Sequence, residues 1–120
     1  MIQKQTILTV ADNSGIKKVQ CIHIYNKKSV AKIGDKILIT IKQGKSKANL
    51  SKGALLPGVI IRTKFSHKTK SNNYLNFEDN SIVLINKQNQ PIGTRILGPI
   101  PIHFRNNKKF KLISLGSVLI

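Results

Sequence analysis

The run Leu55–Lys64 constrains the fold of this chain more than any other stretch. It contains the dipeptide Pro57-Gly58 and the β-branched segment Val59–Ile61, and it ends in the cationic segment Arg62–Lys64. A short apolar run between a Pro-Gly pair and a polar tract is typical of a strand buried in a small β core. The cations that continue to Lys70 predict that this strand leads into a positively charged loop.

Other short segments extend the same pattern. Alternating or apolar residues predict strands near 6–10, 18–25, 36–42, 74–77 and 81–85, with turn signals between them. Segment 43–52 is polar and lysine-rich, which predicts a solvated hairpin tip. Residues 101–109 are compatible with a short helix that has Pro101 in its first turn. Several short strands at near-regular spacing indicate a mainly β fold, a small antiparallel barrel.

Net charge restricts the class of partner. The 120 residues contain 21 Lys and Arg against 4 Asp and Glu, a formal charge of +17. Such an excess repels itself, so we expect a polyanionic partner, and nucleic acid is the common one. An anionic membrane surface is the rival, but no basic amphipathic helix and no apolar run of about 20 residues supports it. We therefore expect no membrane partner and one domain over residues 1–120.

Enzymatic chemistry is not indicated. The sequence has no phosphate-binding glycine motif, no paired C-x-x-C and no H-E-x-x-H. The histidines His23, His67 and His103 lie far apart, and each is more typical of an ordinary surface or strand residue. We expect no catalytic residue, no metal and no cofactor. The single Cys21 excludes an internal disulfide and is typical of a small apolar core residue in a reducing compartment.

The cations are spread over several segments. Any one group is also typical of a solvated surface, but the near absence of compensating acids favours contact with phosphates. Lysines outnumber arginines 18 to 3, and only six aromatic residues are present, so we expect contacts with the RNA backbone rather than base reading or stacking. The predicted RNA-binding residues are Lys17, Lys18, Lys42, Lys45, Lys47, Lys52, Arg62, Lys64, Lys68, Lys70, Arg105, Lys108 and Lys109.

Many ordered matches make the chain resemble the large-subunit ribosomal protein L-fourteen family along its whole length. The matching segments are Met1–Gln3, Thr6, Leu8, Val10–Gly15, Cys21-Ile22, Gly34-Asp35, Lys52-Gly53, Gly58–Lys64, Phe77, Asn80, Val83-Leu84, Pro91–Ile96, Gly98-Pro99, Lys111 and Ile113–Leu115. One such match alone is weak, whereas the ordered set is specific. The chain departs from the family in the shorter loop 26–32, at Ser71–Asn73 and at Ile102–Arg105.

The resemblance implies a five-stranded β-barrel with a projecting hairpin and a short C-terminal helical segment. It implies a structural constituent of the large ribosomal subunit that binds large-subunit rRNA and contributes to an intersubunit bridge with small-subunit rRNA. The implied protein neighbours are the ribosomal proteins L-three and L-nineteen. The implied docking face for the ribosome-silencing factor consists of Thr94, Arg95 and Lys111.

Two questions stay open at this level. Abundant Lys, Ile and Asn with no Trp indicate an A+T-rich genome. Without a recognisable targeting peptide, this composition favours a mitochondrial, organelle-encoded protein, with the cytoplasm of an A+T-rich bacterium or a plastid as alternatives. The alternative function is a free-standing β-barrel RNA-binding translation factor, and a cationic membrane-active protein is a third.

Overall fold

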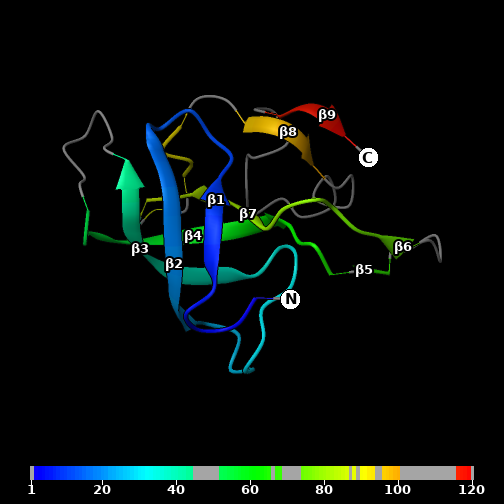
Figure 1. The fold of residues 1–120 in the computed structure, drawn as a ribbon, viewed down its shortest axis with the longest axis horizontal. Coiled ribbons are helices and arrows are strands. Elements are labelled where there is room, and N and C mark those ends of the chain that lie inside the picture. The colour runs from blue at the N-terminus through cyan, green and yellow to red at the C-terminus, as the bar shows by residue number, and fades with distance from the viewer. Residues whose placement is uncertain are drawn as a thin grey trace.

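The computed structural model describes residues 2–44, 52–65, 67–68, 74–86, 88, 90–93, 96–100 and 116–119. All regular structure in these residues is β, and Figure 1 shows the arrangement of the strands. The strands are β1 (Ile7–Val10), β2 (Ile16–Ile24), β3 (Lys36–Gly44), β4 (Leu55–Arg62), β5 (His67–Lys68), β6 (Tyr74–Leu75), β7 (Ser81–Leu84), β8 (Ile96–Ile100) and β9 (Gly116–Leu119).

Five of these strands form a closed barrel in the order β1-β2-β3-β4-β7. This confirms the predicted five-stranded barrel. One pairing corrects the expectation of a wholly antiparallel sheet, because β1 and β7 are parallel, with Thr9 opposite Ser81. The other four neighbouring pairs are antiparallel. The reason is geometric: in a ring with an odd number of strands, directions cannot alternate all the way round, so one pair must be parallel.

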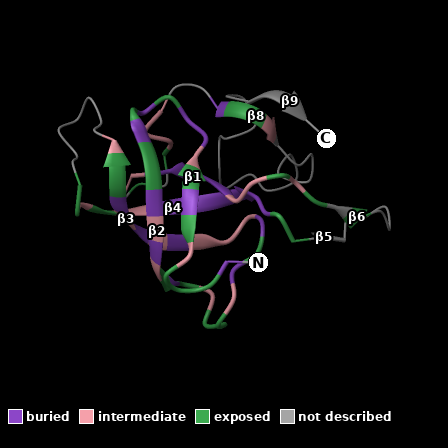
Figure 2. Ribbon diagram, in the orientation of Figure 1, coloured by how far each residue is buried: buried purple, intermediate pink, exposed green. Residues whose placement is uncertain are grey.

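The barrel interior is filled by residues that alternate along β2 and β3. In β3 the buried residues are Ile37, Ile39 and Ile41, as the sequence pattern predicts, and all three are fully buried. In β2, Val19 and Cys21 point into the same cluster. A side-chain period of two is what a strand with one buried and one exposed face requires. Figure 2 shows this change between purple and green along β2.

Strand β7 and the second part of β4, residues 58–62, are buried on both faces. Ile60 and Ile82 belong to the interior cluster, whereas Val59, Ile61 and Val83 belong to a second cluster on the outside of the barrel. Residue Ile96 of β8 packs into this outer cluster. A strand covered on both sides reads as a continuous apolar run rather than an alternating one. The prediction that Leu55–Lys64 contains a buried strand is therefore confirmed, and β8 explains why its pattern does not alternate.

Two small sheets extend the barrel. β5 and β6 pair antiparallel and project from it in Figure 1, so part of the basic tract after β4 lies in a hairpin where the sequence indicated only a loop. β8 and β9 pair in parallel. The predicted hairpin tip at 43–52 and the predicted C-terminal helix near 101–109 fall largely or wholly outside the described residues.

Candidate RNA-binding surface

Lysines gather at the end of the barrel where β2 begins and β3 ends. Lys18 lies opposite Gln43 in the β2–β3 register, which brings Lys17 and Lys18 close to Lys42. All three lysines are exposed. The two strands close tightly here, because a Cβ on Gly44, whose φ is 104°, would lie 2.6 Å from the Gly15 carbonyl oxygen. Glycine at this position therefore lets β3 approach the start of β2.

Lys52 returns to the same end of the barrel. Its neighbour Gly53 donates its backbone N–H to the carbonyl of Ile41, at 2.9 Å, next to Lys42 in the chain. Lys52 is exposed. We call Lys17, Lys18, Lys42 and Lys52 the lysine end of the barrel. Four predicted RNA-binding residues, separated by up to 35 positions in sequence, are thus brought together by strand pairing.

The nearest acid does not neutralise the lysine end. Asp12 precedes β2 but is only 6% exposed, and its carboxylate is used inside the protein. Its Oδ1 accepts hydrogen bonds from the Ser14 backbone N–H and hydroxyl, and its Oδ2 accepts one from the Leu84 N–H. The buried carboxylate holds the turn that leads into β2, while the lysines keep their charge at the surface.

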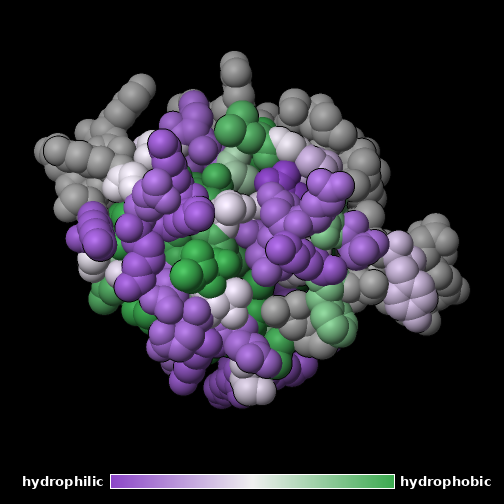
Figure 3. Space-filling view, in the orientation of Figure 1, coloured by the Kyte–Doolittle hydropathy of each residue, from purple (hydrophilic) through white to green (hydrophobic). Residues whose placement is uncertain are grey.

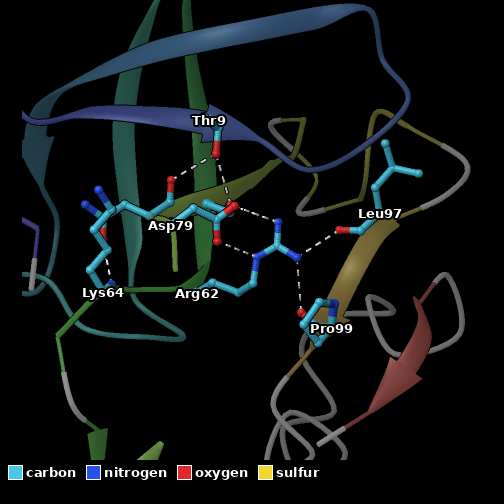
Figure 4. Close-up of polar contacts among 8 residues, drawn as sticks. Thr9, Arg62, Lys64, Asp79, Leu97 and Pro99 are labelled. Atoms are coloured by element: carbon cyan, nitrogen blue, oxygen red, sulfur yellow. Dashed lines mark hydrogen bonds and ion pairs between the residues drawn. The ribbon is translucent and has the colours of Figure 1, made fainter. Parts of the chain in front are cut away.

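Arg62 differs from the other predicted RNA-binding residues that the structure describes. The sequence placed it among the RNA-binding cations, but it is only 8% exposed, and its two terminal nitrogens donate hydrogen bonds inside the protein. Figure 4 shows Arg62 between Asp79 and β8. Its Nη1 donates to the Leu97 carbonyl at 3.0 Å, and its Nη2 donates to the Ser81 hydroxyl at 2.9 Å. Arg62 therefore ties β8 to the barrel and is not part of the exposed cationic set.

An acid completes this internal network. The Arg62 Nε lies 3.2 Å from Asp79 Oδ1, which is ion-pair distance, although its N–H direction misses hydrogen-bond geometry. The second oxygen, Asp79 Oδ2, accepts from Arg62 Nη2 at 3.3 Å and from the Ser81 hydroxyl at 2.8 Å. Ser81 in turn shares a hydrogen bond with the Thr9 hydroxyl at 3.0 Å, so the network reaches β1. The arginine that ends the apolar run of β4 therefore has a structural role, because it links β4 to Asp79, β7 and β8.

The chain beyond Arg62 turns outward. Lys64 is exposed, and its backbone N–H donates to Asn80 Oδ1 at 2.8 Å, as Figure 4 shows. The backbone of Lys68 lies in β5. The other predicted residues fall outside the described part of the chain: Lys45, Lys47, Lys70, Arg105, Lys108 and Lys109, and also Thr94, Arg95 and Lys111.

A second group of cations lies at the opposite end of the barrel, where β2 ends and β3 begins. Lys4, Lys27, Lys28 and Lys32 are exposed there. The sequence showed the pair Lys27-Lys28 in a loop, but nothing in the pattern placed Lys4 beside that loop. Tertiary pairing places Lys4 there, because the antiparallel bridge between Ile2 and Ala31 brings the N-terminal residues to the loop.

The face of the molecule drawn in Figure 3 is mainly polar where residues are described. Hydrophilic residues, purple in Figure 3, cover much of the displayed face and are interrupted by smaller hydrophobic patches. The part of the chain that the structure describes contains no helix long and apolar enough to cross a bilayer. Among the same residues, no group of three or more His, Cys, Asp or Glu side chains is placed to hold a metal ion.

Comparison with known families adds a finding that covers the whole chain. The model of the family described as ribosomal protein L14p/L23e matches residues 1–120. The match includes the barrel, the lysine end and the segments outside the described residues. The chain therefore belongs to the ribosomal protein L14p/L23e family, whose members are structural, non-catalytic constituents of the large ribosomal subunit.

Proposed function

We propose that this protein binds large-subunit rRNA through the lysine end of the barrel, with Lys64 and the cations beyond it as further contacts. The observation that carries the proposal is that Lys17, Lys18, Lys42 and Lys52 converge at one surface while Asp12, the acid nearest in sequence, is buried and internally bonded. A lysine ammonium is a point charge with three donors, which suits contact with phosphate oxygens in many orientations. Such contacts give affinity and position rather than base specificity.

The finer assignments extend this proposal. In the subunit, the protein contributes to a bridge with small-subunit rRNA, contacts the ribosomal proteins L-three and L-nineteen, and presents Thr94, Arg95 and Lys111 to the ribosome-silencing factor. The structure describes the two residues that flank Thr94 and Arg95 in the chain. A Cβ on Gly93 would lie 2.8 Å from Asn13 Oδ1, and Ile96 is only 1% exposed. Both flanking residues are therefore packed closely against the rest of the protein.

The proposed location is the mitochondrial ribosome, on the basis of composition. The test is to locate the protein in its cells: co-fractionation with mitochondrial ribosomes supports the proposal, whereas recovery from plastids or from a bacterial cytoplasm contradicts the location without affecting RNA binding.

A high-salt wash tests the role in the subunit. Large subunits are washed in increasing salt and sedimented, and the protein is followed in pellet and supernatant. An integral constituent stays with the particle, whereas a free-standing translation factor, the alternative function, is released. Recovery of the protein in the wash would contradict the proposed role.

A binding experiment tests the lysine end directly. The affinity of the isolated protein for an rRNA fragment is measured at salt concentrations from about 50 to about 200 mM. Over this range, binding that depends on phosphate contacts weakens by orders of magnitude. Replacing Lys17, Lys18, Lys42 and Lys52 by Gln should reduce the slope of log affinity against log salt by about 0.9 for each lost contact. Since these side chains are exposed, the variants should stay folded. An unchanged slope would refute the assignment.

A further inference from the structure

The cations at the end of the barrel opposite the lysine end surround a pocket. It has a volume of about 660 Å³ and is lined by Lys4, Lys27, Lys28 and His23, with Gln3 and Ser29. Pockets of several hundred Å³ hold small ligands or parts of larger ones. Among the described residues that line it, none is acidic, so the pocket carries an uncompensated positive charge.

The loop that supplies Lys27 and Lys28 is held in place by hydrogen bonds. Asn26 Oδ1 accepts the Lys28 backbone N–H at 2.9 Å. Asn26 Nδ2 donates to the Val30 carbonyl at 3.3 Å and to Asp35 Oδ2 at 2.8 Å. Lys27 has a φ of 64°, a conformation that a non-glycine residue adopts only when its surroundings fix it. The lysine backbone is therefore organised before any ligand arrives, which lowers the entropic cost of binding.

Asp35, whose carboxylate is bonded to the loop that carries Lys27 and Lys28, uses that carboxylate to accept hydrogen bonds from the loop. Asp35 Oδ2 accepts both the Asn26 side-chain N–H and the Lys32 backbone N–H, each at 2.8 Å. Because Asp35 serves as the internal brace of the loop, Lys27 and Lys28 remain without an acidic partner among the described hydrogen bonds and ion pairs. The geometry favours an anion from outside the protein.

An aromatic surface adjoins the lysines. His23 is exposed on β2, and its ring meets Tyr25 edge to face with the centroids 5.2 Å apart. The Lys36 ammonium lies 5.6 Å from the Tyr25 centroid, which adds a cation–π contact. Tyr25 is thus held from two sides and supports the imidazole that forms the pocket wall. A histidine ring is one of the aromatic surfaces on which an unpaired RNA base can stack.

We infer that this pocket binds an unpaired RNA nucleotide, with its phosphate between Lys4, Lys27 and Lys28 and its base stacked on His23. The inference rests on the proposed function, because it names a second RNA site on the same protein. His23 lies five positions after Lys18 in β2, about 17 Å along the strand. This exceeds the Debye length of about 10 Å at 0.1 M salt, so the two sites act independently in solution.

Binding of defined RNAs to the full chain tests the inference. The probes are a 12-nucleotide single-stranded RNA and a duplex of equal length, followed by fluorescence anisotropy at several salt concentrations. Lys27→Gln combined with Lys28→Gln should weaken single-strand binding and reduce its salt slope by about 1.4, at roughly 0.7 per contact. His23→Ala should weaken single-strand binding at least about fivefold with the slope unchanged, because stacking is not ionic. Circular dichroism checks that each variant is folded.

A matched pair at the lysine end separates the two proposals. Lys17→Gln combined with Lys18→Gln removes the same charge and should leave the effect of His23→Ala intact. If the Lys27 and Lys28 variant binds single-stranded RNA like the unmodified protein while the Lys17 and Lys18 variant does not, the pocket is refuted and the proposed function stands. If the unmodified protein shows no salt dependence, the proposed function fails first.

Titration with inorganic phosphate identifies the source of the anion. Phosphate alone should bind weakly and compete only with the ionic part of RNA binding. If phosphate binding is lost in the Lys27 and Lys28 variant while RNA binding is unchanged, the pocket is a site for a free anion, and the inference of an RNA nucleotide is overturned. The inference is also overturned if His23→Ala weakens duplex and single-strand binding equally.

Discussion

Arg62 should stabilise the fold by joining β8 to the barrel, and Arg62→Met tests this. Methionine keeps much of the alkyl volume and removes the guanidinium. The lost bonds join Nη1 to the Leu97 carbonyl at 3.0 Å and Nη2 to the Ser81 hydroxyl at 2.9 Å, together with the ion pair to Asp79. Leu97 and Ser81 belong to different sheets, so the substitution removes a cross-link between them.

The expected magnitude follows from burial. Each of the two hydrogen bonds comes from a charged donor that is 8% exposed, and each is worth about 1.5 kcal/mol, the lower end of the range for such bonds, because the carbonyl of exposed Leu97 can rebind water. The Asp79 side chain is 44% exposed, so solvent screening limits its pairing with Arg62 to under about 1 kcal/mol. We expect Arg62→Met to lower the free energy of unfolding by about 3–4 kcal/mol.

Urea unfolding followed by circular dichroism measures this change. Arg62→Lys is the matched control, because it keeps the charge and loses the planar fork, so an intermediate loss is expected. Hydrogen exchange adds a local readout: the Leu97 N–H, bonded to the Ala11 carbonyl at 2.6 Å, should exchange faster in Arg62→Met. A loss under about 0.5 kcal/mol, or a lysine variant as stable as the unmodified protein, would refute the structural role of Arg62.

Three further changes test other parts of the fold. Gly98→Ala should lower the free energy of unfolding by about 1–3 kcal/mol, because φ is 85° and the new Cβ would overlap Arg62 Nη1; the loss should be smaller in an Arg62→Met background. Asp12→Ala should cost about 1–3 kcal/mol in thermal unfolding by leaving the buried Leu84 N–H without its acceptor, and a loss near zero would contradict this. Burial raises the pKa of the Cys21 thiol above its ordinary value of 9.0, so the unfolded thiol ionises first and stability should fall as pH rises past that value. A disulfide reagent should accordingly react slowly with Cys21 in the folded protein and fast in urea. Rapid reaction in the folded state would contradict the burial of Cys21 in the core.

The candidate site was only partly predictable. Lys17, Lys18, Lys42 and Lys52 were recognised as cations, but their convergence depends on the β2–β3 register and on the Gly53 hydrogen bond, which sequence spacing does not reveal. The burial of Arg62, which was predicted as an RNA-binding cation, was not foreseen for a related reason. An arginine at the end of an apolar strand is normally solvated, and its burial here requires Asp79 and Ser81, both of which arrive from more than 15 residues away.

The sequence by itself determined the β class and a buried strand within Leu55–Lys64, and its net charge led to the expectation of a polyanionic partner. These follow from local alternation, turn residues and net charge, all of which act without knowledge of the neighbours. Tertiary structure alone decided the parallel closure of β1 on β7, the second apolar layer under β8 and the separation of the lysines into two ends. The physical reason is that strand order and register bring together residues far apart in the chain, and only those neighbours decide whether a charge stays in water or is buried and paired.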